Sequence, residues 1–242
     1  MINSLLVTIN QLLPPAVLLV FALVLHVKPL GRKRWLILSL WLVVPTLSYI
    51  LALEQISQWF DYLGFEYSQM LLVALLVLAA LSGLALRLWA SFVLLLASAS
   101  CLYLSHYLPW LLQGQMELAR ALGVCLGVGI VGSFAILFYF FLTWLADHYG
   151  PWGVLGLFSM HIAGSMVGML DIAAGAGLLT MPSPLVDLRT LLDEHSIFGR
   201  LAKVVVGYEA TPSSLSLWVY ILTLLALLGA AKWQRSRQEC DI

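Results

Sequence analysis

Long apolar runs, separated by short polar stretches, make up most of this chain. A membrane-spanning helix needs about 20 mostly apolar residues, because the hydrocarbon layer is about 30 Å thick and a helix rises about 1.5 Å per residue. These runs are continuous, whereas the strands of a membrane barrel alternate apolar and polar residues. The pattern predicts an all-α integral membrane protein, with a single transmembrane domain over residues 1–242. Its seven spans are expected at about Leu5–Val27, Leu36–Leu53, Met70–Leu86, Leu88–Leu108, Leu118–Leu145, Trp152–Leu179 and Leu215–Ala231.

The composition supports a membrane protein and argues against other classes. Of the 242 residues, 62% are hydrophobic and 10% are charged, whereas about a quarter of the residues of a soluble domain are charged. The 12 basic residues balance the 12 acidic ones, so no basic surplus indicates nucleic acid as a partner. Cys101 and Cys125 lie in apolar runs and Cys240 in the tail, a spacing that gives neither a disulfide framework nor a zinc site. The lipid bilayer is the partner that the composition predicts.

The basic residues also predict an orientation. Eight lysines and arginines lie in the first loop, the third loop and the tail, which share one side of the membrane if the spans alternate, and four lie on the other side. Cytoplasmic loops carry an excess of Lys and Arg. We therefore expect a multi-pass protein with its N-terminus outside and its C-terminus in the cytoplasm.

The sixth span, which contains the stretch GLFSMHIAGSMVGMLDIAAGAGLL, carries the polar residues of greatest interest. Ionisable groups inside a span are candidates for function, because placing them in lipid is expensive. His161 and Asp171 lie in this run, with Met166 and Met169 between them. Imidazole and thioether groups suit Cu(I), and imidazole also suits iron. The alternative interpretation is structural, with methionine filling gaps and histidine hydrogen-bonding across a helix interface.

Two further features of the pattern bear on the bundle and on its chemistry. Gly164 and Gly168 have the GxxxG spacing that lets helix backbones approach closely, so the sixth span is expected at the centre of the bundle. The chain contains no G-x-S-x-G, H-E-x-x-H or Walker-type motif, and no nucleophile–base pair is visible. We therefore do not expect an enzyme.

The polar stretch before the last span predicts one more helix. Ile197, Leu201 and the Val204–Val205 pair recur at helical spacing, with Phe198 adjoining. Gly207 can end this helix and Pro212 prevents its continuation. Its N-cap is expected to be Asp187, Asp193 or Ser183. We expect an extracytoplasmic amphipathic helix that lies on the outer membrane face.

The stretch Asp193–Leu222, DEHSIFGRLAKVVVGYEATPSSLSLWVYIL, resembles the end of the oxidase-dependent iron permease family, the high-affinity iron permeases of yeast and the bacterial ferrous-uptake permeases. Bacterial members carry a similar H-S-x-F-G … G-Y-x-x-x-P-S run before their last span. The matching residues here are His195, Ser196, Phe198, Gly199, Gly207, Tyr208, Pro212 and Ser213. Weaker similarity reaches the first loop and the fifth and sixth spans. The resemblance implies seven spans, an external N-terminus, a bacterial cytoplasmic membrane and iron uptake.

The chain departs from that family at the iron site. The resemblance implies an R-E-x-x-E motif in each of the first and fourth spans, where carboxylates suit ferric iron. The matching positions are Gln11–Pro15 and Ala99–Tyr103, and neither span contains Glu or Arg. A transporting relative would therefore need a different set of ligands.

Two functional hypotheses follow. The first is an iron-permease-like membrane protein that takes up a metal ion, with iron or copper as the transported species and His161, Met166, Met169 and Asp171 as candidate ligands. The alternative is a non-transporting scaffold or accessory subunit of a metal-uptake or periplasmic redox assembly. It would bind a periplasmic metal-binding or oxidase protein through His195, Ile197 and Phe198.

Overall fold

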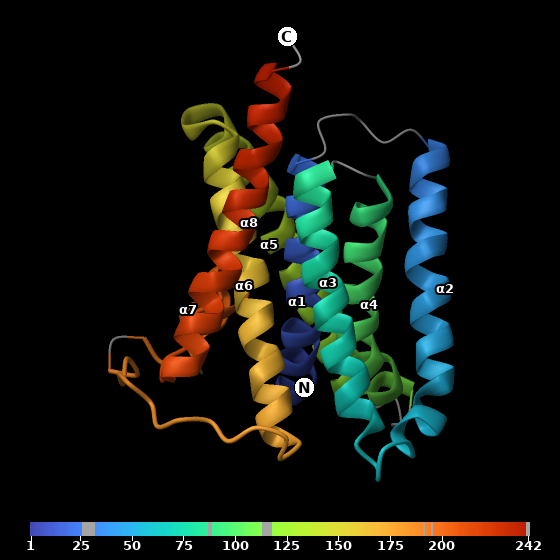
Figure 1. Ribbon diagram of the computed structural model, residues 1–242. Helices are drawn as coiled ribbons and strands as arrows, with labels where there is room; N and C mark the ends of the chain where they lie inside the picture. The colour runs from blue at the N-terminus through green and yellow to red at the C-terminus, as the bar shows by residue number, and fades with distance from the viewer. Residues whose placement is uncertain (26–31, 87–88, 113–117, 191, 195, 241–242) are drawn as a thin grey trace. The chain divides into compact units, whose positions relative to one another are not determined.

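The computed structural model describes residues 1–25, 32–86, 89–112, 118–190, 192–194 and 196–240 (Figure 1). The side chains of residues 32–35, 89, 197, 235 and 237–240 lie outside the description. The described part is helical, and its only β-type pairing is an isolated antiparallel bridge between Pro184 and Ser213. The helices are α1 (Ile2–Leu25), α2 (Arg32–Ser57), α3 (Gly64–Leu86), α4 (Trp89–Leu112), α5 (Leu118–Tyr149), α6 (Pro151–Gly175), α7 (Ile197–Val206) and α8 (Ser214–Cys240).

Seven of these helices, all except α7, are long and apolar enough to cross a membrane. This confirms the predicted fold class, an all-α multi-pass membrane protein with a short helix before its last span. The boundaries differ in places, since α3 begins at Gly64 rather than Met70 and α5 continues to Tyr149. The helix α6 ends at Gly175, four residues before the predicted Leu179. It ends there because Gly177 adopts a φ of 72°, and the N–H of Leu178 turns back to the carbonyl of Ala173.

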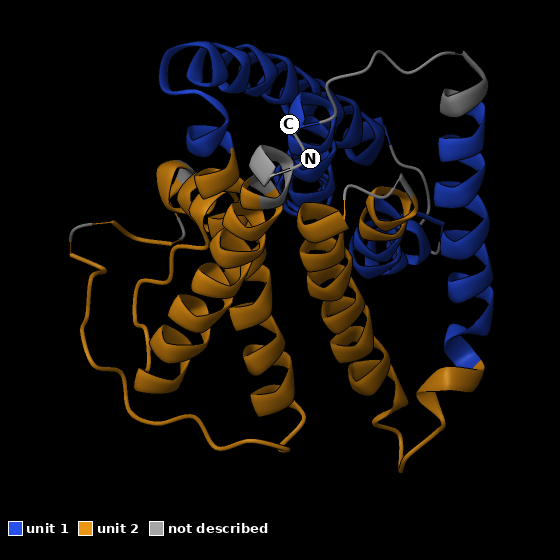
Figure 2. Ribbon diagram, turned by 45° about the horizontal axis from the view of Figure 1, so that its top comes forward, with its two compact units in different colours: residues 1–54, 96–154 blue, residues 55–95, 155–242 orange. Residues whose placement is uncertain are grey.

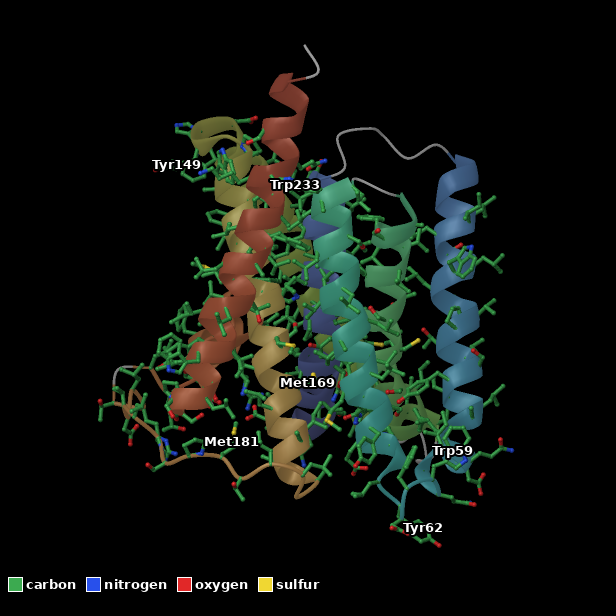
Figure 3. All side chains as sticks on the ribbon, in the orientation of Figure 1. Trp59, Tyr62, Tyr149, Met169, Met181 and Trp233 are labelled. Atoms are coloured by element: carbon green, nitrogen blue, oxygen red, sulfur yellow. The ribbon has the colours of Figure 1, made fainter. Side chains whose placement is uncertain are left out.

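Exposed aromatic side chains mark several helix ends (Figure 3). Trp59 and Tyr62 follow the end of α2, Tyr149 closes α5, and Trp233 lies in the last part of α8. All four are exposed. Trp and Tyr concentrate at the two membrane–water interfaces, because their rings are apolar with one polar group. Their placement agrees with the ends of the predicted spans.

The chain contacts divide into two compact units, residues 1–54 with 96–154 and residues 55–95 with 155–242 (Figure 2). The single transmembrane domain expected from the sequence stays a prediction. In the first unit α1 packs against α5. A Cβ atom at Gly123 would collide with Ser4, and one at Gly127 would collide with Thr8. Close backbone contact at small residues therefore holds this helix pair together, as is common in membranes.

The second unit holds the candidate site. In it α3 packs against α8, and α6 contacts both α7 and the turn that follows α7. The segments α6, α7 and α8 appear as amber, orange-red and red in Figure 1. Every contact of the candidate site lies within this unit.

Candidate functional site

The helix α7 has a defined beginning and end. Its N-cap is Ser196, whose Oγ accepts a hydrogen bond from the N–H of Gly199 at 3.0 Å. The three candidates from the sequence, Asp187, Asp193 and Ser183, were wrong. Asp193 instead accepts a hydrogen bond through its backbone carbonyl from the Ser196 hydroxyl, at 2.6 Å. The C-cap is Gly207 with a φ of 70°, as the sequence predicted, and its N–H reaches the carbonyls of Ala202 and Lys203.

The C-terminal end of α7 contacts the middle of α6. Gly207 lies against Gly164, and a Cβ atom added to either glycine would collide with the backbone of the other. One turn away, Nδ1 of His161 lies 2.5 Å from the carbonyl oxygen of Val204. His161 is 10 residues after Pro151 and 14 residues before Gly175, the two ends of α6. At about 1.5 Å per residue, this contact lies about 15 Å from one end of the helix and about 21 Å from the other.

This placement corrects one expectation. The amphipathic helix exists as predicted, but it does not lie flat beyond the end of the neighbouring span. Its last turn reaches halfway along α6, because two glycines without side chains let the backbones meet. We call residues 196–213, which comprise α7 and the extended chain that follows it, the re-entrant segment.

Side chains from two spans cap the inner end of α7. The last four carbonyls of a helix have no partner within the helix, and in a membrane each unsatisfied group costs several kcal/mol. His161 from α6 bonds to Val204, and the Tyr220 hydroxyl from α8 donates to Val206 at 2.6 Å. The N–H of Gly207 donates to Lys203 at 3.0 Å. Three of the last four carbonyls thus accept a hydrogen bond, which allows a helix end to be buried at this depth.

The contact with a carbonyl fixes the tautomer of His161. A carbonyl oxygen only accepts, so Nδ1 carries a proton, and in the neutral form of the ring the lone pair is on the buried Nε2. A histidine that ligates a metal commonly donates its other N–H to a backbone carbonyl in this way. The same bond also serves a purely structural histidine between helices. His161 is 4% exposed, so either role would be performed inside the protein.

The other three predicted ligands lie further along α6. Met166 and Met169 are partly buried, and Met169 is labelled in Figure 3. Asp171 is exposed and lies 10 residues from His161, about 15 Å along the axis. The structure therefore does not bring Asp171 to His161. Among the described residues, no group of three or more His, Cys, Asp and Glu side chains could hold a metal ion.

Charged groups gather where the re-entrant segment begins. Glu194 accepts hydrogen bonds through both carboxylate oxygens, from the N–H of Ala210 at 2.6 Å and from Nζ of Lys203 at 3.1 Å. Burial raises the pKa of the Glu209 carboxyl, and the negative charge of Asp171 raises it further, while a hydrogen bond from Ser216 opposes them. The sequence interpretation missed Glu194, Lys203 and Glu209. They lie at no common helical spacing, so no local pattern could have grouped them.

Backbone contacts fix the course of the chain after Gly207. The N–H of Leu188 donates to Ala210 at 2.8 Å, and the N–H of Leu185 donates to Pro212 at 3.0 Å. The extended chain therefore runs beside residues 185–188 until Ser213, whose Oγ accepts from the N–H of Ser216 at 3.1 Å and begins α8. The re-entrant segment is thus a helix followed by an extended return.

Of the predicted partner-binding residues, Phe198 is the one whose side chain the structure describes, and it lies in the first turn of α7. Phe198 is 75% exposed. His195 lies outside the described residues, as does the side chain of Ile197. Leu185 and Val186, in the chain that precedes the segment, are also exposed.

Comparison with protein-family models, with curated proteins and with solved structures finds no match for this chain. The resemblance to the iron permeases therefore stays a prediction. What the chain itself establishes is a multi-pass membrane protein of seven apolar helices, with a short helix that ends midway along the sixth.

Proposed function

We propose that the protein conducts a metal ion, iron or Cu(I), inward across a bacterial cytoplasmic membrane, with its N-terminus outside and its C-terminus in the cytoplasm. The observation that carries this proposal is the end of α7 midway along α6. Non-helical backbone at membrane depth is tolerated where it is buried in protein or lines a water-filled cavity. In transporters, interrupted helices meet near the membrane midplane, and their C-terminal ends help to coordinate cations.

The electrostatics of this arrangement favour a cation. The C-terminus of a helix carries about half an elementary negative charge from its aligned peptide dipoles. Here that end lies beside a buried neutral imidazole whose Nε2 has the lone pair that a soft or borderline metal prefers. Met166 and Met169 would add thioether sulfur on the same helix, and Asp171 would attract the cation from a distance rather than ligate it. The resemblance to iron permeases supports the same class of substrate.

The first test is uptake of radiolabelled ferrous iron, ferric iron and Cu(I) into proteoliposomes of the purified protein. The sharpest variant is His161→Asn, because the Asn amide can still donate to Val204 while Nε2 is removed. We expect loss of uptake with an unchanged elution profile. The matched control is His106→Asn, which removes an imidazole from α4, where Nδ1 lies 3.3 Å from the Leu102 carbonyl. Unchanged uptake in a variant with His161, Met166 and Met169 all replaced by Leu would exclude these ligands.

A second candidate function is a scaffold subunit, and the observation that favours it is the exposure of Phe198. A benzyl side chain that is 75% exposed would contact a periplasmic metal-binding or oxidase protein. The test is a photo-crosslinking amino acid at position 198, with one at the exposed Ser236 on α8 as the control. A crosslink to one such protein at 198 alone, together with no metal uptake, would favour the scaffold over the transporter.

A further inference from the structure

Glu194, which lies just before the re-entrant segment, joins three parts of the chain. It precedes α7, it pairs with Lys203 on α7, and it accepts the N–H of Ala210 on the extended return. The two oxygens of one side chain therefore hold the helix and the return together. Hydrogen bonds to a charged group are about twice as strong as those between neutral groups.

The inner end of the segment is held differently. The contact between Gly164 and Gly207 joins two backbones without any interlocking side chain. Besides this contact, the described hydrogen bonds from side chains to the tip are those of His161 and Tyr220. The tip is therefore held to α6 and α8 by one backbone contact and two directional hydrogen bonds.

The charges around Glu194 disfavour the arrangement in which the re-entrant segment lies against α6. Three carboxylates, Asp171 on α6 with Glu194 and Glu209, face the single ammonium of Lys203. Asp171 belongs to α6 and Glu209 to the return, so like charges face each other between that helix and the return. The pair between Glu194 and Lys203 offsets this repulsion. Glu194 thus joins α7 to the return beside these like charges, in addition to the backbone bonds that Leu185 and Leu188 make to the return.

We propose that the re-entrant segment is a gate, and that Glu194 is the clasp that keeps its tip against α6. Release of the Glu194 carboxylate frees the helix and the return from each other, so the tip at Gly207 leaves Gly164 and water reaches His161. This proposal rests on the proposed function, because a gate midway along the spans regulates the passage of an ion along that path.

The test measures whether water reaches the tip. Val205→Cys places a thiol in the last turn of α7, in a protein whose Cys101, Cys125 and Cys240 are replaced by Ala. A membrane-impermeant thiosulfonate reagent is added outside proteoliposomes, and the labelling rate is measured. We expect Glu194→Gln to raise this rate about tenfold, because it removes the charge from two charge-assisted hydrogen bonds.

The matched control is Glu209→Gln, which removes the same charge from the extended return but breaks no bond to Ala210 or Lys203. We expect its labelling rate to stay at or below that of the parent, since it relieves the repulsion from Asp171. Lys203→Gln is a second clasp variant, in case Glu194→Gln does not fold, and it should raise the rate. Equal rates in the parent and in every folded clasp variant would overturn the gate, and so would an equal rise in Glu209→Gln.

The labelling assay needs no transport, so the two proposals can fail separately. Faster labelling in Glu194→Gln without metal uptake by any variant supports the gate and refutes the transporter. Metal uptake with unchanged labelling refutes the gate and leaves the transporter standing.

Discussion

Substitution of Gly164 by Ala tests the contact on which the site depends. The added methyl group would meet the Cα and N atoms of Gly207, which belong to backbone and cannot rotate away. Its neighbour Gly168 is one turn further along the same helix and has nothing within 4 Å of its Cβ position. The two glycines form the GxxxG pair of the sequence, so they share helix, depth and residue type. Gly168→Ala is therefore a matched control.

The two substitutions are expected to change the free energy of unfolding in opposite directions. Overpacking a close contact costs about 1–3 kcal/mol, and a clash with backbone belongs at the upper end of that range. Replacing Gly by Ala inside a helix gains about 1 kcal/mol. Gly164→Ala should therefore be destabilised by about 2 kcal/mol, while Gly168→Ala should be stabilised by about 1 kcal/mol. The free energies of unfolding of the two variants should differ by about 3 kcal/mol.

The assay is reversible unfolding of purified protein in mixed micelles, with SDS as the denaturant and helix content as the signal. Thiol labelling at Val205→Cys gives a local readout, and its rate should rise in Gly164→Ala alone. If both alanine variants were equally stable, or if Gly164→Ala were the more stable, the close approach of Gly164 and Gly207 would be refuted. The depth of α7 along α6 would then need another explanation.

Three further predictions test other contacts. In α5, Gly127→Ala should lower the free energy of unfolding by about 2 kcal/mol, because the added methyl group clashes with α1. Gly129→Ala, whose Cβ position is open, should not lower it, and SDS unfolding of the two variants measures the difference. Tyr220→Phe should cost about 1–3 kcal/mol, because the carbonyl that Tyr220 caps stays buried, and an unchanged unfolding midpoint would contradict this cap. The raised pKa of Glu209 means that the folded state binds its proton more tightly than the unfolded state, so Glu209 destabilises the fold above that pKa. Glu209→Gln should therefore have a higher Tm than the parent at pH 8, and this difference should vanish below the ordinary pKa of a glutamate carboxyl. Equal Tm values at pH 8 would contradict the prediction.

The parts of the fold that were predicted correctly depend on local pattern. Seven apolar runs give seven long helices because lipid offers no partner for free backbone groups. The spacing of Ile197, Leu201 and Val204 gave α7, and Gly207 marked its end because only glycine adopts that backbone conformation at no cost. The N-cap was wrong because Asp187, Asp193 and Ser183 were taken as candidates, whereas the cap is Ser196, which directly precedes Ile197, the first apolar residue of that spacing.

The depth of α7 could not be predicted for a different reason. An apolar helix face looks the same in sequence whether it lies on lipid or on another helix. The contacts that decide between them join residues far apart in the chain, Gly164 with Gly207 and Val206 with Tyr220. His161 was singled out as an ionisable residue inside a span, but its bond to Val204 depends on the same long-range placement.

The short length of α7 has a consequence for the biogenesis of the protein. The insertion machinery releases into lipid segments of about 20 apolar residues, whereas α7 has 10 and carries Arg200 and Lys203. It therefore cannot enter the bilayer as an independent unit while the chain is being made. Its place between α6 and α8 exists only after α8 has been synthesised, since Tyr220 supplies one of its caps. The docking of α7 must follow the insertion of the last span, so a ribosome that stalls before Tyr220 would leave α7 undocked from α6.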